Sequence, residues 1–285
     1  MTQSTAKRSD AITKGPAKAP ARAMLRGAGY TDEQMAQPMV AVVNTWSTVT
    51  PCNMHLGDLA EPIREGLRGG GATPVDFNTI VVSDGITMGG EGMRASLISR
   101  EIIADSIELA VKGHSLDAAI ILVGCDKTIP AAAMALARLD IPGLVFYGGT
   151  ILPGRLGDRD LSIQDVFEAV GAHAKGDMSD SELDQVERAA CPGAGACGGQ
   201  FTANTMAMAL AMMGISPMGS GDPPATDAAK RVEAARCGRL AAKLAKEGTS
   251  ARSFVTPTSI RNAATAVVAS GGSTNAVLHL PAIAA

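Results

Sequence analysis

The chain has 285 residues and a formal net charge of −3, with 46% hydrophobic and 19% charged residues. This length is ample for one large or two smaller domains with a substantial core, and the composition is that of an ordinary globular protein. The slight acidic excess excludes the basic footprint of a nucleic-acid-binding protein, and no apolar run reaches the length needed to span a bilayer.

The N-terminal region is basic and lacks the apolar core of a secretory signal. Asp10, Pro16 and Pro20 argue against an organelle transit peptide. We expect an arm and a first helix over residues 1–34, with the arm extended and packed on the body or on a partner subunit, and a main domain over 35–285. Five cysteines without a secretion signal favour a reducing, cytoplasmic setting, in which thiols ligate metals or lie in cores.

Short β-branched runs alternate with helical stretches along the first half of the chain. Strands are expected at 38–46, 78–85, 116–124 and 141–149, with helices at 56–71, 91–113 and 131–139. Strands that are apolar on both faces and alternate with helices predict an α/β fold, with a parallel sheet flanked by helices on both faces. A mostly helical segment follows, with a polar link at 151–162, a glycine-rich loop at 191–199 and helices at 162–176, 179–190, 201–214 and 225–248.

Polar residues follow three of the predicted strands, as TPCN, SDG and GCDK. Ligands bind outside the carboxyl ends of strands in open parallel sheets, so these segments are expected to converge on one site. Asp84 and Asp126 carry the oxygen ligands that Mg²⁺ prefers, although each could instead cap a turn or a helix. Lys127 is unusual, because a cation at a helix N-terminus opposes the helix macrodipole.

The positions of the cysteines are compatible with several roles. Cys52 and Cys125 lie at strand ends, while Cys191 and Cys197 flank the glycine-rich loop, whose backbone could wrap closely around a bulky cofactor. Without a CxxC pair, structural zinc and ferredoxin-type spacing are poorly supported, and an iron–sulfur cluster with widely spaced ligands stays open. Cys237 within a helix reads as a small buried hydrophobe.

The four histidines, at positions 55, 114, 173 and 279, read as structural or exposed, since none is spaced for a metal site with another. The stretch GGSTNA (271–276) could cradle an anion at a helix start or form an ordinary glycine turn. Neither feature identifies a function by itself.

Nine segments of the chain resemble, in order, the motifs of the dihydroxy-acid dehydratase / phosphogluconate dehydratase family: APARAMLR, NTWSTVTPCN, FNTIVVSDGI, SREIIADS, CDKTIPAAAMA, ILPGR, CPGAGACGGQFTANTMA, PPATD and GGSTNAVLHL. The resemblance covers nearly the whole chain. It implies a hydro-lyase that dehydrates a 2,3-dihydroxy carboxylic acid of the 2,3-dihydroxy-3-methylbutanoate type to the 2-oxo acid, in branched-chain amino-acid (valine, isoleucine) biosynthesis. A sugar-acid or 6-phosphogluconate dehydratase of the same family is the alternative.

The resemblance also implies the cofactors. Carried over by position, the family's cluster ligands fall on Cys52, Cys125 and Cys197. A cysteine at the position of Cys52 favours a [2Fe–2S] cluster over a [4Fe–4S] cluster. Three protein thiolates leave one iron with an open position, unlike a closed electron-transfer cluster.

The family's magnesium ligands fall on Asp84, Asp126 and Lys127, with the lysine carbamylated. Carbamylation would turn a cation into an anionic oxygen ligand, which suits both a helix N-terminus and a hard metal. The resemblance further implies a small-molecule dihydroxy acid as substrate and a homodimer, with neither nucleic acid nor membrane as partner.

Two departures from the family pattern stand out. Gly90, in MGGEGM (88–93), replaces a histidine that the family commonly carries. The motif Thr-Asp-Gly-Arg-x-Ser-Gly, whose serine is taken as the base, is not among the 285 residues, nor is a further glutamate ligand of magnesium. From this we expect an inactive fragment that lacks the family's C-terminal β-rich domain. An inactive α/β binding module and an electron-transfer protein with Cys191 as fourth ligand are the other readings.

Overall fold

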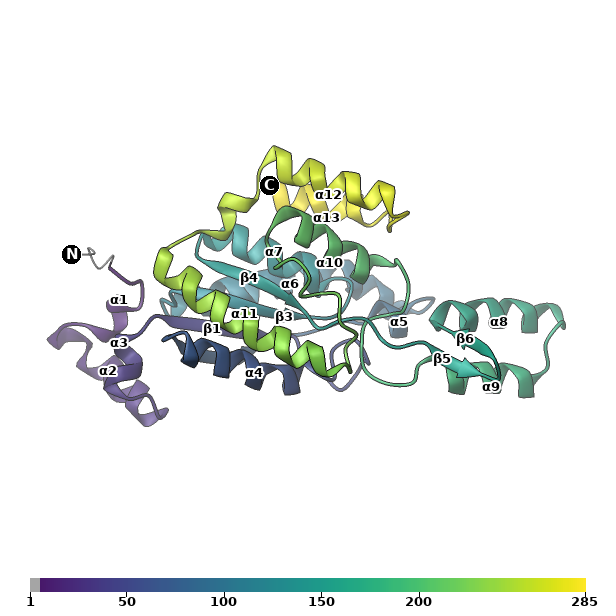
Figure 1. Ribbon diagram of the computed structural model, residues 1–285, viewed down its shortest axis with the longest axis horizontal. Helices are drawn as coiled ribbons and strands as arrows, with labels where there is room; N and C mark the ends of the chain where they lie inside the picture. The colour runs from purple at the N-terminus through teal and green to yellow at the C-terminus, as the bar shows by residue number, and fades with distance from the viewer. Residues whose placement is uncertain (1–5) are drawn as a thin grey trace.

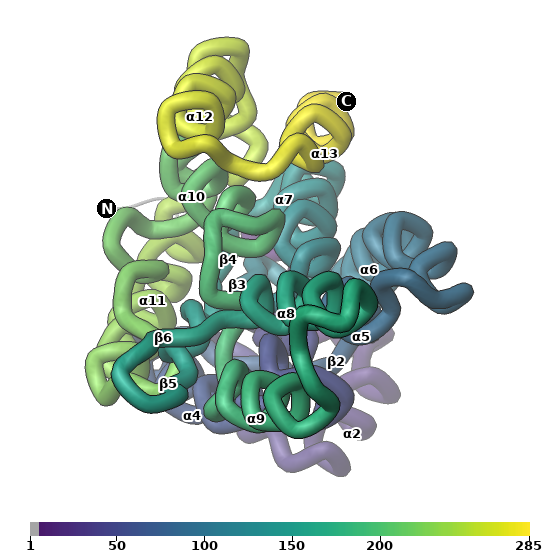
Figure 2. The backbone as a smooth tube through the Cα atoms, turned by 90° about the vertical axis from the view of Figure 1, so that its right-hand side faces the viewer, coloured from purple at the N-terminus to yellow at the C-terminus, as the bar shows by residue number. Residues whose placement is uncertain are grey.

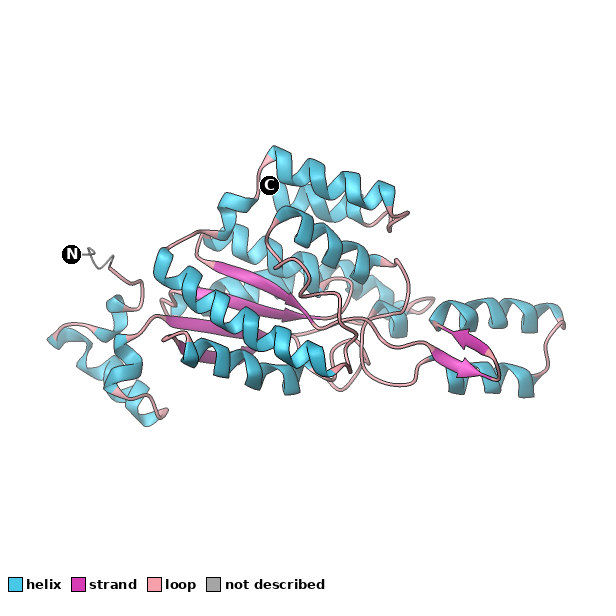
Figure 3. Ribbon diagram, in the orientation of Figure 1, coloured by secondary structure: helices cyan, strands magenta, loops and turns pink. Residues whose placement is uncertain are grey.

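The computed structural model describes residues 6–285 and shows an α/β fold around a four-stranded parallel sheet (Figures 1 and 3). The strands are β1 (Met39–Asn44), β2 (Thr73–Asn78), β3 (Ala118–Val123) and β4 (Gly143–Tyr147), in the order β2-β1-β3-β4. β1, β3 and β4 are buried on both faces, as their continuous apolar runs predict. The predicted parallel α/β class and three of the four strands are confirmed.

The strand expected at 78–85 is wrong. β2 lies earlier in the chain, and Asn78, its last residue, pairs with Asn44, the last residue of β1. Because β2 is an edge strand whose only neighbour ends there, the β-branched run after Asn78 has no ladder to join. Residues 79–83 instead form a loop that leads into the short helix α5 (Asp84–Thr87).

Helices cover both faces of the sheet (Figure 1). α4 (Leu56–Gly69) and α11 (Ala228–Glu247) pack together on one face, and α6 (Arg94–Gly113) and α7 (Thr128–Leu139) on the other. α10 (Thr202–Met213), α12 (Pro257–Ala269) and α13 (Ala276–Ala284) form a further group beyond α7. Cys237 lies on the buried side of α11, which confirms its interpretation as a small hydrophobe. Of the helices in residues 6–285, none combines the length and apolarity needed to cross a membrane.

The strand order creates a crevice at the carboxyl edge. From β1 the chain passes through α4 to β2 on one side, whereas from β3 it passes through α7 to β4 on the other. The connections that leave these two neighbouring strands therefore diverge, and such a switch point is where open α/β sheets bind ligands.

A separate unit follows β4 and projects from the carboxyl edge. It contains the antiparallel pair β5 (Gly154–Leu156) and β6 (Arg159–Leu161), followed by α8 (Ile163–Lys175) and α9 (Asp180–Ala190), around a small apolar core of its own. The link expected at 151–162 thus contains a hairpin that its polar composition concealed. Figure 2, which looks onto this end of the molecule, shows α8 and α9 in front of the sheet.

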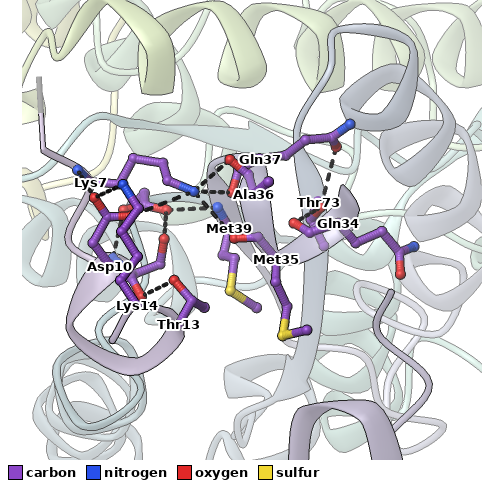
Figure 4. A network of polar contacts seen from close by, with 12 residues as sticks. Lys7, Asp10, Thr13, Lys14, Gln34, Met35, Ala36, Gln37, Met39 and Thr73 are labelled. Carbon is purple, nitrogen blue, oxygen red and sulfur yellow. Dashed lines mark hydrogen bonds and ion pairs between the residues drawn. The ribbon is translucent and has the colours of Figure 1, made fainter. Parts of the chain in front are cut away.

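The N-terminal residues lie at the opposite end (Figure 1). Residues 1–5 of the predicted arm lie outside the described residues. The following ones form α1 (Asp10–Thr13), α2 (Ala19–Gly27) and α3 (Asp32–Ala36) with one 3-10 turn, so the expected extended conformation is wrong there. Lys7 Nζ donates to the carbonyls of residues 35, 36 and 37 at 3.3, 2.7 and 2.9 Å and so caps α3 (Figure 4).

Asp117 holds this N-terminal segment to the sheet. Its carboxylate accepts from the Ser9 backbone N–H at 2.9 Å, the Ser9 hydroxyl at 2.7 Å and the Met39 N–H at 2.7 Å, all buried. We expect Asp117→Ala to lower the free energy of unfolding by about 2–3 kcal/mol, because buried donors lose a charged acceptor. Trypsin should also cleave faster at Lys14. The exposed Asp105→Ala is the control, and unchanged cleavage of Asp117→Ala would contradict this attachment.

Lys230, at the start of α11, is a fully buried cation. Its Nζ donates to the carbonyls of Ser220 at 2.9 Å and Tyr147 at 3.4 Å and lies 5.7 Å from the centre of the Phe146 ring. Within residues 6–285 it forms no ion pair with a carboxylate. Burial therefore lowers the pKa of Lys230 from 10.5 to about 8.

This pKa predicts a dependence of stability on pH. Between pH 8 and 10.5 the unfolded chain binds more protons at this lysine than the folded chain, so stability rises with pH over that window. Between roughly pH 8 and 10, we expect the free energy of unfolding of the native chain to rise by about 2 kcal/mol relative to that of Lys230→Met. Urea unfolding of both chains at several pH values measures the difference, and parallel profiles would contradict it.

Candidate functional site

Two cysteines meet at the switch point of the sheet. Cys125 lies two residues after β3, and Cys52 lies in the loop between β1 and α4; both thiols are buried and interact with each other. Gly124 allows this approach, because a Cβ on it would lie 2.0 Å from the Cys52 carbonyl oxygen. The Thr128 hydroxyl accepts from the Cys125 N–H at 3.1 Å and fixes the turn into α7.

Cys197 reaches the same place from the glycine-rich loop. The Gly195 N–H donates to the Pro51 carbonyl at 2.9 Å, which ties this loop to the one that carries Cys52. Gly195 has φ +130°, and a Cβ there would lie 2.3 Å from the Ile151 nitrogen, so the loop requires glycine at this point. The Cys197 thiol in turn acts on Cys52, so that all three sulfurs are neighbours.

Asn204 on α10 holds the Cys197 loop in position. Its Nδ2 donates to the carbonyls of Cys197 at 3.1 Å and Gly199 at 2.6 Å. Its Oδ1 accepts from the Tyr147 hydroxyl at 2.6 Å and the Thr150 hydroxyl at 2.8 Å. One carboxamide therefore links the loop to the end of β4.

Burial and neighbouring thiols raise the pKa values of Cys52 and Cys125. A bond with Cys125 lowers the pKa of Cys52, but the Cys197 thiol and burial outweigh it and bring the value to about 12. The Cys52 thiol and burial likewise raise the pKa of Cys125. Clustered thiols that resist ionisation release protons when a cation binds them, since thiolates are the metal-ligating form.

A second group of ionisable side chains lies beside the cysteines. Asp84, the first residue of α5, accepts from Lys127 Nζ at 2.6 Å and from the Ser96 hydroxyl at 2.5 Å. The side chains of Asp84 and Lys127 are only 6% and 5% exposed. Lys127 is the N-cap of α7, so the sheet edge and two helix starts fix this pair.

Asp126 completes the group. Burial and the charge of Asp84 raise its pKa to about 6, while Lys127 and a hydrogen bond from Thr202 on α10 act in the opposite direction. Two carboxylates this close repel each other unless a cation separates them. Asp84, Asp126 and Lys127 are therefore brought together, as their positions after strands led us to expect.

Two adjoining cavities open onto these groups. The smaller, about 160 Å³, is lined by Cys52, Cys191 and Cys197 among others. The larger, about 570 Å³, includes Asp84, Asp126 and the turn 271–275 in its walls. Gly85, Ile163 and Cys197 border both, so a molecule in the larger cavity would lie next to the cysteines.

The thiols and the carboxylates suit different inorganic cofactors. Among residues 6–285, no three His, Cys, Asp or Glu side chains form a site for a single metal ion. Three neighbouring thiols, of which Cys52 and Cys197 line a small glycine-bordered cavity, fit a polynuclear iron–sulfur cluster, whose ligands surround a larger body. Two carboxylates offer oxygen ligands for Mg²⁺, which keeps open positions for water or substrate.

Comparison with known proteins identifies the family. Residues 37–285 match the model of the dihydroxy-acid/6-phosphogluconate dehydratase N-terminal domain. The chain belongs to this family. The dihydroxy-acid dehydratase of Koribacter versatilis is 58% identical over 278 residues, which are 98% of this chain and 48% of that protein.

Other dihydroxy-acid dehydratases are similarly related. That of Roseiflexus sp. strain RS-1 is 51% identical over all of this chain and 51% of its own length, and that of Natronomonas pharaonis is 50% identical over 98% and 47%. The chain thus spans about half the length of the curated dehydratases it matches. Similarity of this extent confirms the family resemblance that the motifs indicated.

Several residues around the site escaped the sequence analysis. Asn204 and Thr202 lie within the motifs that carry the resemblance, and Ser96 lies three residues before one of them, but only their contacts reveal what they hold. His279 was read as structural or exposed; it is fully buried near Lys127, with Nε2 unpaired. Gly90 is exposed and its Cβ position lies 3.4 Å from the nearest atom, the Thr87 carbonyl oxygen, so the backbone there has room for a side chain.

Proposed function

We propose that the chain is the cluster- and magnesium-bearing part of a hydro-lyase that dehydrates a 2,3-dihydroxy carboxylic acid of the 2,3-dihydroxy-3-methylbutanoate type, in branched-chain amino-acid biosynthesis. One observation carries this proposal: two adjoining cavities share Cys197, and Cys52 lines one of them while Asp84 and Asp126 line the other. Cys125 lies against Cys52, and Lys127 lies against Asp84. One small molecule in the larger cavity would thus reach both groups. Overall, C2 loses a proton, C3 loses its hydroxyl as water, and the enol becomes the 2-oxo acid without net redox change.

In this proposal, Cys52, Cys125 and Cys197 hold a [2Fe–2S] cluster as thiolates. Asp84, Asp126 and a carbamylated Lys127 hold Mg²⁺. When bound, the cluster and Mg²⁺ supply Lewis acidity, the first to the departing 3-hydroxyl and the second to the carboxylate and 2-hydroxyl.

The chain's own residues position these groups. Ser96 orients the Asp84 carboxylate, Thr202 orients that of Asp126, and Asn204 keeps the Cys197 loop against the end of β4. We assign no residue of the chain as the base.

The residues that line the larger cavity indicate which type of substrate it would hold. Met88, Ile163 and Phe167 form an apolar side, which would exclude water from a short branched aliphatic end. A sugar acid carries hydroxyls there instead, and Gln164 and Gln200 line the same cavity. Measuring the dissociation constant of each acid type for the chain would distinguish the two substrates. Tighter binding of the branched aliphatic acid would support the proposal, and tighter binding of the sugar acid would support the alternative.

The test begins with anaerobic reconstitution of the chain with iron and sulfide. We expect about two irons and two acid-labile sulfides per chain, with the visible spectrum of such a cluster. Cys125→Ser should abolish both, whereas Cys237→Ser, on the buried side of α11, should leave the counts unchanged.

Cys191→Ser decides between the two cluster functions. Cys191 lines the smaller cavity but is exposed, and we expect its variant to retain the cluster. Loss of the cluster would identify a fourth thiolate and favour electron transfer. A folded native chain that takes up no iron would overturn the assignment of the three cysteines.

The proposal extends to the setting and assembly of the protein. Free thiols as ligands require a reducing compartment, for which we propose the cytoplasm. We also propose a homodimer, as the family resemblance implies. Sedimentation equilibrium of the chain tests the dimer, and a monomer at all concentrations would refute it for this chain.

A further inference from the structure

His279 on α13 is a fully buried imidazole with one unsatisfied nitrogen. Arg100 Nη1 lies 3.0 Å from its Nδ1 and 3.2 Å from the Leu278 carbonyl oxygen. A guanidinium group only donates hydrogen bonds, so Nδ1 accepts and the imidazole proton sits on Nε2. Nε2–H is thus a buried donor that finds no acceptor among residues 6–285, a situation that is rare in folded proteins.

The position of this donor is defined by α6. Ser96 and Arg100 are four residues apart and therefore share one side of that helix. Ser96 binds Asp84, Arg100 binds His279, and Asp84 binds Lys127. His279 consequently lies one helical turn along from the Asp84–Lys127 pair.

Electrostatics agree with this placement. Burial, together with the charges of Lys127 and Arg100, lowers the pKa of His279 to about 4, while the charge of Asp84 acts in the opposite direction. The imidazole therefore stays neutral near pH 7 and keeps its single proton on Nε2. As an ammonium group, Lys127 offers only donors, so it cannot accept a hydrogen bond from this N–H.

We propose that His279 Nε2–H donates a hydrogen bond to a carbamate oxygen on Lys127 and so positions that group. The inference rests on the proposed function, in which Lys127 is carbamylated. In that step the neutral amine of Lys127 attacks CO₂, an N–C bond forms, one C=O π bond becomes the carboxylate oxygen, and nitrogen releases a proton. The carbamate replaces the hydrogen-bond donors of the Lys127 ammonium group with acceptor oxygens, one of which can accept from the unpaired His279 Nε2–H.

The experiment uses the 285-residue chain with ¹³C-labelled CO₂ and Mg²⁺, and detects the carbamate carbon by NMR. We expect one protein-bound signal in the native chain and none in Lys127→Arg. His279→Leu should need at least tenfold more CO₂ for the same signal, whereas His279→Gln, whose amide N–H can replace Nε2–H, should recover most of it. Circular dichroism confirms that each variant is folded.

A second measurement needs no variant. With ¹⁵N-labelled histidine, the Nε2 proton of His279 should move downfield when CO₂ is added, because it gains a charged acceptor. A native carbamate signal with no such shift, or equal CO₂ dependence in His279→Leu, would overturn the role of His279 and leave carbamylation standing. Absence of the native signal would overturn the lysine modification itself, and with it this inference.

Discussion

Replacing Gly124 with alanine is expected to abolish iron and sulfide uptake by separating Cys52 from Cys125. The added Cβ would lie 2.0 Å from the Cys52 carbonyl oxygen, where backbone rather than a flexible side chain must move. Such overpacking costs about 1–3 kcal/mol, so we expect a folded but destabilised chain. Iron and sulfide counts after anaerobic reconstitution, with urea unfolding beside them, measure both effects.

Gly171→Ala is the matched control. Gly171 lies within α8, and a Cβ there meets no atom within 4 Å. Alanine favours the helix by about 0.5–1 kcal/mol over glycine, so this variant should be slightly more stable and bind as much iron as the native chain. Full iron uptake by Gly124→Ala would show that the close contact of the two loops is unnecessary for the three cysteines to act together.

Asp84→Asn is expected to lower the free energy of unfolding by about 3 kcal/mol or more in buffer without metal or CO₂. The substitution keeps the shape of the side chain but removes the carboxylate that pairs with the buried Lys127 ammonium at 2.6 Å, so that within residues 6–285 only Asp126 remains near the cation. Most of the loss should return in the double variant Asp84→Asn/Lys127→Met, since the uncompensated cation is then gone. Urea unfolding of the native chain, of the single variants Asp84→Asn and Lys127→Met, and of the double variant gives the coupling free energy directly.

An exposed ion pair provides the comparison. Asp105 accepts from Arg138 at 2.9 Å, with side chains 57% and 38% exposed, and Asp105→Asn should change stability by less than about 1 kcal/mol. Equal losses for the buried and exposed variants would mean that water reaches the Asp84–Lys127 pair. In saturating Mg²⁺ and CO₂, the stability loss of Asp84→Asn relative to that of Asp105→Asn should change, because the carbamate proposed on Lys127 removes the cation that Asp84 neutralises.

The misplaced second strand shows the limit of local pattern. Residues 79–82, Thr-Ile-Val-Val, have stronger β-propensity than the Thr-Pro-Val-Asp that opens β2. Strand formation nevertheless depends on a partner, and β1 ends opposite Asn78. The consequence is functional: the freed segment becomes the loop that delivers Asp84 to Lys127.

By itself, the sequence determined the α/β class, three of the four strands and the family, because apolar periodicity and long ordered motifs are local properties of the chain. It also indicated Cys52, Cys125, Asp84, Asp126 and Lys127 as neighbours, since residues that follow parallel strands meet at one edge. Only the tertiary structure decided the strand order, the link of the Cys197 loop to the Cys52 loop, and the unpaired Nε2 of His279. These depend on contacts between segments far apart in the chain, and no spacing along the sequence encodes which hydrogen-bond partner a distant helix will supply or withhold.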